Sequence, residues 1–324
     1  MTRRLVVVVA KRSLYDRAVR ERRDPKVMAL FQKRDVSVSN WRKAHLEHER
    51  TLKKVLQVLK SLGVSVTTLR GPGVVFDASD AALVVSVGGD GTLLAASHHV
   101  ADVPILGVNS APEHSVGFFC PAQRDNVEGL LKAALDGSLP SVSLARMQVS
   151  VNSRVCSRRV LNEALFSHAN PGATSRYIVS YNDRVEEQRS SGVWVGTAAG
   201  STAAIRSAGG RVMPFASRRL QLVVREPYIE PGDNYDLDRL IIEPHDHVTL
   251  LSKMEDARLY LDGPYRQVPV ELGDRVVCSV SEEPLTVFGL GQRRAPRSHT
   301  LVGASVPQRS QRKPVKKKKK RASG

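Results

Sequence analysis

Aliphatic runs that alternate with helical patterns constrain the fold of this chain more than any other feature. Leu5–Ala10 is continuously aliphatic, as expected for a strand buried on both faces of a sheet. Leu83–Val87 and Ile105–Val108 have the same character, whereas Trp41–Leu62 and Val127–Leu135 carry apolar residues at helical spacing. Strands separated by helices predict a parallel, Rossmann-like sheet covered on both faces.

The second half of the chain has a different texture. After about residue 141 the segments are short, β-rich and divided by turn residues, which predicts a mostly antiparallel β domain with one short helix at residues 201–208. We therefore predict an α/β domain (1–141), a β-rich domain (142–274), C-terminal strands that pack back on the first domain (275–304) and a disordered basic tail (305–324).

The formal charge of +17 lies largely in that tail. Residues 309–324 contribute nine positive charges and no negative ones, which leaves +8 for residues 1–308. A moderately basic body suits an anionic substrate such as a nucleotide. The run Lys316–Lys320 has nothing apolar to bury. Contact with nucleic acid or polyphosphate, a localisation signal and a merely solvated extension all stay open for the tail.

Cysteine usage and hydropathy bound the compartment. Cys120, Cys156 and Cys278 are far apart and form no CxxC pair, which disfavours a disulfide framework or a zinc site and fits a reducing, cytoplasmic setting. Leu5–Ala10 is too short to cross a bilayer, so no membrane association is expected. His45 and His48 are not at i, i+4 spacing and no third ligand is in view, so no metal site on histidines is expected. Surface positions are expected for His98 and His99.

The sequence Gly88-Gly89-Asp90-Gly91-Thr92 stands between a buried strand and a helix that begins near Leu93. Ligands of open α/β sheets bind at the carboxyl ends of strands, where this loop must lie. Its glycines let a phosphate approach the backbone, and the helix N-terminus attracts anionic oxygen. Because Asp90 would repel phosphate, its predicted task is to orient and deprotonate an attacking hydroxyl. The alternative is a turn in which Asp and Gly only supply backbone angles.

This loop resembles the GGDGT loop of NAD kinases, of diacylglycerol and sphingosine kinases and, in shorter form, of phosphofructokinases. Four further motifs, which together with the loop span about residues 82–263, follow the order found in NAD kinases. They are Gly107-Val108-Asn109 with Gly117-Phe118-Phe119, Leu161-Asn162-Glu163-Ala164, Gly200-Ser201-Thr202-Ala203 and Leu261-Asp262-Gly263. Residues 109–115 and the pair Ser190-Ser191 are most similar to the mitochondrial-type branch or a bacterial relative of it.

The resemblance implies a two-domain NAD kinase that transfers the γ-phosphoryl group of Mg-ATP to the adenosine ribose 2′-hydroxyl of NAD(H), forming NADP(H). It implies that Asp90 is catalytic and that a nucleotide phosphate is held by Gly88, Gly89, Gly91, Thr92 and Asn109. Mg²⁺ would arrive with ATP rather than on protein side chains. The family also leads us to expect a homo-oligomer.

For the NAD substrate the resemblance implies a site in the β-rich domain. Asn162 can offer its amide to the adenine edge, and Glu163 can accept from ribose hydroxyls or the adenine amine. The residues implied for NAD binding are Asn162, Glu163, Thr197, Gly200, Ser201, Thr202 and Ala203, with Asp262 as a further candidate.

Three departures from the family pattern leave alternatives open. The segment Thr197-Ala198-Ala199-Gly200 stands where most members have Thr-Pro-Thr-Gly, and Ala204 replaces the tyrosine that stacks on the substrate. Ser191 stands where many members carry an acidic residue. A lipid kinase of the diacylglycerol or sphingosine type and an NAD-binding sensor with weak turnover are the alternatives, and preference between NAD and NADH stays open.

Overall fold

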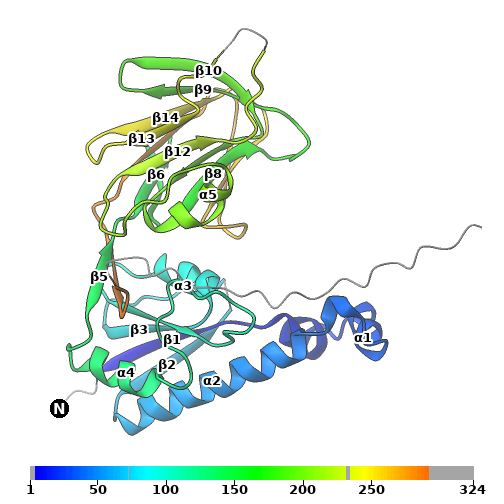
Figure 1. Ribbon diagram of the computed structural model, residues 1–324, viewed down its shortest axis with the longest axis vertical. Helices are drawn as coiled ribbons and strands as arrows, with labels where there is room; N and C mark the ends of the chain where they lie inside the picture. Colours follow the sequence, from blue (N-terminus) through cyan, green and yellow to red (C-terminus); the bar gives the residue numbers. More distant parts are fainter. Residues whose placement is uncertain (1–3, 72, 231–233, 292–324) are drawn as a thin grey trace, which may run out of the picture. The chain divides into compact units, whose positions relative to one another are not determined.

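A six-stranded sheet in the order β2-β1-β3-β4-β18-β5 underlies the N-terminal part (Figure 1). The computed structural model describes residues 4–71, 73–230 and 234–291. Neighbouring strands are parallel except β5, which runs antiparallel to β18. The strands are β1 (Leu5–Ala10), β2 (Ser65–Arg70), β3 (Ala81–Gly88), β4 (Ile105–Asn109), β5 (Ser141–Leu144) and β18 (Leu285–Phe288).

Alternate residues of β1 serve two separate cores. Val6 and Val8 pack with residues of α2 (Trp41–Ser61) and α4 (Val127–Leu135). Val7 and Val9 face the other way, toward the core that contains residues of α3 (Asp90–Ser97). Figure 1 shows α2 and α4 along one face of the sheet and α3 on the other. The parallel sheet covered on both faces is therefore confirmed, with β5 as an antiparallel addition.

The charged segment between β1 and α2 forms short helices. They are a π-helical turn η1 (Asp16–Glu21), the helix α1 (Pro25–Gln32) and a 3-10 turn η2 (Val36–Val38). The Asp24 side chain caps α1 by accepting hydrogen bonds from the amides of Lys26 and Val27 at 3.0 and 3.2 Å. The sequence of this segment is charged and only weakly periodic, so its pattern alone does not indicate these helices.

Two six-stranded sheets, whose neighbouring strands are all antiparallel, form the β-rich part. Both supply side chains to one core, in which the rings of Phe166 and Tyr177 meet edge to face at 6.0 Å. The first sheet has the order β10-β9-β14-β17-β6-β7, made of β6 (Met147–Val151), β7 (Arg154–Val160), β9 (Ser175–Tyr181), β10 (Arg184–Ser190), β14 (His247–Ser252) and β17 (Arg275–Val280). The second has the order β13-β12-β11-β8-β15-β16, made of β8 (Glu163–His168), β11 (Val193–Gly196), β12 (Leu220–Val224), β13 (Arg239–Ile242), β15 (Ala257–Leu261) and β16 (Gln267–Val270).

The short helix expected at residues 201–208 is observed as two turns, a 3-10 turn η3 (Ala199–Thr202) and α5 (Ala204–Ser207). Within the segment 275–304, β18 joins the N-terminal sheet whereas β17 belongs to the β-rich part. The predicted basic tail lies outside the described residues. Among the helices that the structure describes, none is long and apolar enough to cross a membrane.

A fully buried guanidinium connects the β-rich part to helix α3. Arg146, between β5 and β6, donates to the carbonyl oxygens of Ser97 and Val100 at 3.0 and 2.8 Å, just where α3 ends. It also donates to the carbonyls of Glu283 and Pro284. Burial lowers the pKa of Arg146 to about 10, so the side chain stays charged at neutral pH. A cation at the C-terminal end of a helix interacts favourably with its exposed carbonyl groups.

Candidate functional site

Asp90 is the first residue of α3, directly after the carboxyl end of β3. Its two carboxylate oxygens accept hydrogen bonds from the backbone amides of Phe118 and Phe119, at 2.9 and 2.8 Å. The position in the first helical turn favours a negative charge. These contacts fix the carboxylate in one orientation and leave each oxygen a second lone pair for a substrate hydroxyl.

The loop that holds Asp90 is itself braced by Asn109, at the end of β4. The Asn109 amide donates to the Ser115 carbonyl at 2.9 Å and packs against Gly117. Gly117 has a φ of +61°, a conformation that glycine adopts without strain, and it turns the chain so that the next two amides reach Asp90. Asn109 thus lies in the site, where it supports the Asp90 anchor.

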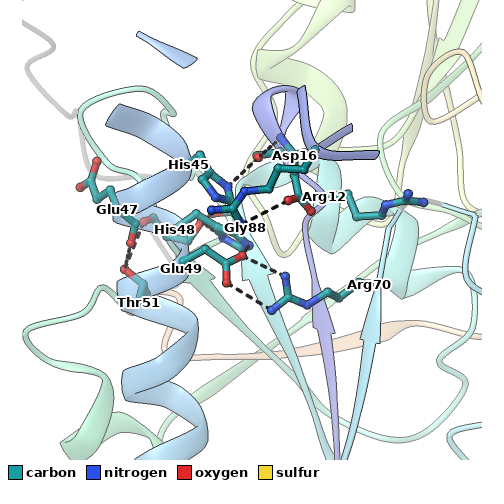
Figure 2. Close-up of polar contacts among 12 residues, drawn as sticks. Arg12, Asp16, His45, Glu47, His48, Glu49, Thr51, Arg70 and Gly88 are labelled. Atoms are coloured by element: carbon teal, nitrogen blue, oxygen red, sulfur yellow. Dashed lines mark hydrogen bonds and ion pairs between the residues drawn. The ribbon is translucent and has the colours of Figure 1, made fainter. Parts of the chain in front are cut away.

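Helix α2 supports the same strand end from behind. His48 Nδ1 lies 2.9 Å from the Ser110 hydroxyl, and the Ser110 amide donates to the Gly88 carbonyl at 2.8 Å. Figure 2 shows His45 and His48 reaching from α2 toward Gly88, with Glu49 pairing with Arg70 beside them. Burial, reinforced by Lys11, lowers the pKa of His48 to about 4, so this brace is neutral.

A cavity of about 450 Å³ opens beside Asp90. Its wall contains the predicted residues Gly89, Gly91 and Thr92, and it also contains Lys11 and Arg17 from the segment after β1. The sequence prediction did not include Lys11 and Arg17, because the segment after β1 is rich in charged residues and carries no motif. The signal that could have found them is the position of Lys11 and Arg17 after a strand. Because β1 and β3 are parallel neighbours, the residues that follow each of them lie at the same edge of the sheet.

The polar groups in and near this cavity include buried atoms that have no hydrogen-bond partner in the described part of the chain. Among the described residues, Arg17 Nε and His114 Nε2 are buried without a hydrogen-bond acceptor or donor. Lys11 is half-buried, and burial lowers the pKa of its amine while Glu47 partly offsets that shift. Buried polar groups are rarely left unpaired in native proteins, so these atoms indicate an anionic ligand.

The second group of predicted residues gathers where the chain passes from β7 to β8. The Thr197 amide donates to the Asn162 carbonyl at 2.9 Å, and the Thr197 hydroxyl donates to the Leu161 carbonyl. Gly200 packs directly on the Asn162 backbone. The structure therefore brings Asn162, Glu163, Thr197 and Gly200 together, although they lie as much as 38 positions apart.

Asn162 and Glu163 present buried acceptors. Asn162 Oδ1 and Glu163 Oε2 have no hydrogen-bond partner among the described residues, and each residue is 8% exposed. Burial, and secondly the charge of Asp262, raises the pKa of Glu163 to about 8. Leaving such groups unpaired is costly, and a ligand with amine or hydroxyl donors would satisfy both.

The remaining predicted residues divide by role. The Ser201 hydroxyl donates to the Ala198 carbonyl at 2.8 Å and accepts from the Met213 amide at 2.9 Å, so it stabilises the turn η3 from inside. Thr202, the last residue of η3, and Ala203 and Ala204, which lead into α5, are half-buried. Of this group, the Ser201 side chain is fully buried and is used within the protein.

Asp262, named from sequence only as a further candidate, supports the loop beneath Asn162 and Glu163. It accepts hydrogen bonds from the amides of Leu161, Asn162 and Glu163 at 2.8, 2.7 and 3.2 Å. His98 Nε2 lies 2.9 Å from Asp262 Oδ2, and both side chains are 2% exposed. The surface position expected for His98 is therefore wrong: the end of α3 faces the β-rich part, and this imidazole lies against a buried carboxylate.

An aromatic cluster joins the two groups of residues. Phe118 and Phe119, whose amides hold Asp90, pack against Phe215 with ring centroids 5.6 and 6.3 Å apart. Leu161 and Ala199, which flank the Asn162 loop and η3, belong to the same buried core. The Asp90 site and the Asn162–Glu163 site thus share one packed interior.

Close packing at Gly200 gives a stability prediction. A Cβ atom at residue 200 would overlap the Asn162 backbone, so Gly200→Ala should destabilise the protein by about 1–3 kcal/mol. Gly129 is an exposed residue within α4 and has open space around it. Gly129→Ala should therefore stabilise by about 0.5–1 kcal/mol. Urea unfolding of both variants measures the difference, and equal effects would contradict the packing described here.

The described residues contain no group of three or more His, Cys, Asp or Glu side chains able to hold a metal ion. The buried His45 and His48 are used in contacts with Ser13 and Ser110 instead. A divalent ion at this site would need most of its oxygen ligands from a bound substrate.

Comparisons with known proteins agree with this geometry. The family model described as ATP-NAD kinase N-terminal domain matches residues 6–139. The chain is 34% identical to the "Probable NADH kinase" of Oryza sativa subsp. japonica, over 74% of this chain and 80% of that protein. It is also 34% identical to the "NADH kinase" of Arabidopsis thaliana, over 76% and 86% of the two chains. The fold is similar to that of an NAD kinase from Archaeoglobus fulgidus crystallised with ATP, with a TM-score of 0.64 and 20% identity over 90% of this chain and 95% of that one.

Proposed function

Because this chain belongs to the ATP-NAD kinase family, we propose that it transfers the γ-phosphoryl group of ATP to the 2′-hydroxyl of the adenosine ribose of NAD or NADH. Family membership confirms the resemblance inferred from the GGDGT loop and its four companion motifs. The observation that carries the proposal is the anchored Asp90 carboxylate on the wall of a cavity that also presents Lys11 and Arg17.

In the proposed reaction the ribose hydroxyl oxygen attacks the γ-phosphorus, and the bond from that phosphorus to the β,γ-bridging oxygen breaks to release ADP. Asp90 accepts a hydrogen bond from the hydroxyl and takes its proton. The two backbone amides that hold the carboxylate stabilise its negative charge, so we assign its main contribution to orienting the hydroxyl for in-line attack.

The donor phosphates are assigned to the cavity beside Asp90. Lys11 and Arg17 would offset their negative charge, and the Nε of Arg17 has a hydrogen bond to give. Gly89 and Gly91 keep the wall free of side chains next to the phosphates. Magnesium belongs to the proposal as part of the Mg-ATP substrate, where phosphate oxygens bind it.

The acceptor dinucleotide is assigned to the loop of Asn162 and Glu163. Asn162 Oδ1 and Glu163 Oε2 are the unpaired acceptors there, and adenine and ribose offer matching amine and hydroxyl donors. Thr197 and Gly200 shape this loop from below. That two of the most similar relatives are named NADH kinases supports testing the reduced dinucleotide beside NAD.

The decisive experiment supplies the purified protein with Mg-ATP and either NAD or NADH and measures NADP or NADPH with a reductase or dehydrogenase specific for the phosphorylated form. Parallel reactions replace ATP with polyphosphate, or the dinucleotide with diacylglycerol and sphingosine. We expect phosphorylated dinucleotide and no phosphorylated lipid. Lipid phosphorylation without NADP formation would overturn the proposal in favour of a lipid kinase, and tight NAD binding without product would favour a sensor.

Removing a cation from the cavity should weaken donor binding. Lys11→Ala is expected to raise KM for ATP about tenfold and to leave KM for the dinucleotide within twofold, because Lys11 lines only the cavity beside Asp90 among the described pockets. Lys33→Ala, an exposed change at the end of α1, is the matched control. Steady-state kinetics with each substrate varied in turn test this, and an unchanged KM for ATP in Lys11→Ala would refute the assignment.

The setting of the enzyme is part of the proposal. Sparse, unpaired cysteines suit a cytoplasmic enzyme that contributes to NADP biosynthesis, and we propose a homo-oligomer on family grounds. Contact of the lysine-rich tail with nucleic acid or polyphosphate stays an open alternative to a solvated extension or a localisation signal. Size-exclusion chromatography with light scattering measures the assembly state.

A further inference from the structure

His98 stands at the far end of the helix that begins with Asp90. It directly follows the last residue of α3, and its imidazole points away from solvent, with 2% of the side chain exposed. Nε2 lies 2.9 Å from Asp262 Oδ2 without the alignment of a hydrogen bond. The ring nitrogen of His98 therefore faces the carboxylate directly, and both groups are shielded from solvent.

Asp262 connects His98 to the loop of Asn162 and Glu163. Its backbone has a φ of +51°, a left-handed conformation that is uncommon for a residue other than glycine. Its carboxylate accepts from three consecutive amides, those of residues 161–163, and its own amide donates to the Glu163 carbonyl at 3.0 Å. A conformation of this kind persists only where its surroundings hold it in place, and functional sites are where it is most often found.

The surroundings fix His98 as firmly as they fix Asp262. The His98 carbonyl accepts from Arg159 Nη1 at 3.2 Å, and the neighbouring Ser97 carbonyl accepts from Arg146 Nη1 at 3.0 Å. Arg159 is held in turn by Glu283 at 2.6 Å. The C-terminal end of α3 is therefore immobilised against the β-rich part by two guanidinium groups and one imidazole.

We propose that His98 is a positioning residue for the dinucleotide: it holds Asp262, which sets the backbone of residues 161–163, so that Asn162 and Glu163 face the substrate. This rests on the proposed function, in which Asp90 and the Asn162–Glu163 loop serve one transfer. Helix α3 then begins with Asp90. His98, which directly follows its last residue, orders the loop of Asn162 and Glu163. His98 touches no reacting atom, and its effect passes through Asp262.

The test compares three single variants in the full-length protein. His98→Leu keeps a similar volume and removes the ring nitrogen that faces Asp262, and His98→Gln keeps a polar N–H group that can reach Asp262. His99→Leu is the matched control, because His99 is less buried and its ring contacts Phe76 and Arg266 instead. We expect His98→Leu to weaken dinucleotide binding about tenfold and to leave KM for ATP within twofold. His98→Gln should recover at least a third of the lost affinity, and His99→Leu should match the wild type.

Two further measurements separate positioning from folding and from the proposed function. Calorimetric titration with NAD and NADH reads the effect of His98 even if no turnover is found, so a failure of the kinase assignment does not hide it. In a double-mutant cycle, adding His98→Leu to Asp262→Asn should weaken binding no further, because the two act as a unit. A parallel rise in KM for both substrates that follows a fall in Tm, additive effects in the cycle, or unchanged dinucleotide affinity in His98→Leu would each overturn the proposal.

Discussion

Asp90→Asn is expected to lower turnover about a hundredfold to ten-thousandfold while the protein stays folded and still binds the dinucleotide. The amide cannot take the proton of the attacking hydroxyl. It also offers only one oxygen to two backbone donors, since the other carboxylate oxygen, now an NH₂ group, would face the amide of Phe118 or Phe119. Loss of that hydrogen bond should cost about 1–3 kcal/mol of stability.

Asp80→Asn is the matched control for Asp90→Asn. Asp80 is exposed just before β3 and undergoes the same chemical change at the opposite end of the strand. Single-turnover NADP formation measures the chemical step, and calorimetry measures dinucleotide affinity. Turnover near the wild-type rate in Asp90→Asn would refute the catalytic assignment. A loss of dinucleotide binding equal to the loss of turnover would instead make Asp90 a structural residue.

Glu163→Gln is expected to stabilise the free protein at pH 7 to 8 and to weaken dinucleotide binding about tenfold or more. The buried carboxyl has a pKa raised to about 8, first by burial and then by Asp262, from an ordinary value of 4.5. A neutral glutamine avoids the cost of ionising a buried group, but it offers the substrate one acceptor oxygen where an ionised carboxylate offers two. Stability and binding should therefore change in opposite directions, as expected where a site is built for a ligand rather than for folding.

The sign of the pH dependence follows from the two protonation states. Between pH 4.5 and 8 the folded protein keeps the Glu163 proton while the unfolded chain has lost it. The unfolded state then binds fewer protons, so the contribution of Glu163 to stability falls as the pH rises through this window, by about 1.4 kcal/mol for each pH unit. Below pH 4.5 both the folded and the unfolded protein hold the Glu163 proton, and above pH 8 neither holds it. In both ranges the contribution of Glu163 to stability is therefore constant.

Urea unfolding at pH 5.5, 6.5 and 7.5 without nucleotide tests this behaviour. The difference in unfolding free energy between Glu163→Gln and the wild type should grow with pH, because all other titrating groups cancel in the comparison. Glu255→Gln, at an exposed turn, is the matched control and should follow the wild type. A difference that is constant across the three pH values would show that Glu163 is ionised in the folded protein and would contradict the raised pKa.

The sequence predicts the N-terminal sheet well because its strands are buried on both faces. Continuous aliphatic runs such as Leu5–Ala10 are typical of strands that are buried on both faces of a sheet. Strand β10 (Arg184–Ser190) has no strand pattern in the sequence because the side chains it turns inward are polar: Gln188 and Ser190 are buried against the Tyr177 hydroxyl at 3.2 and 2.8 Å. Inward-facing groups of this kind leave no apolar alternation to detect.

Two segments with a continuous hydropathy pattern are each a pair of strands in the structure. The segments 142–151 and 155–166 look continuous in hydropathy, yet each crosses from one sheet to another within a few residues. The first break lies at Arg146, which turns inward to reach the end of α3. The second lies at Leu161 and Asn162, whose amides turn toward Asp262. In both cases a polar contact over more than 40 positions overrides the local pattern.

For the candidate site, the sequence predicts the groups to which we assign the chemistry but not the groups that hold them. Asp90, Asn162 and Glu163 stand out because their motifs fix residue type and order. The anchors of Asp90 are backbone amides 28 and 29 positions away, and backbone amides carry no residue signature. His98 likewise gave no signal, since a histidine in a helix is usually exposed and only the fold places it against Asp262.

The attachment of α3 at both ends bears on how substrates enter. Many kinases close a cleft by hinge bending between lobes, and the closure expels water. Here such bending would pull Arg146 away from four carbonyl groups in a buried setting, which makes it costly. The two lobes should therefore move as one block. Shielding the transferring phosphoryl group from solvent then falls to the side chains that line the cavity, of which Val116 and Tyr265 are largely exposed.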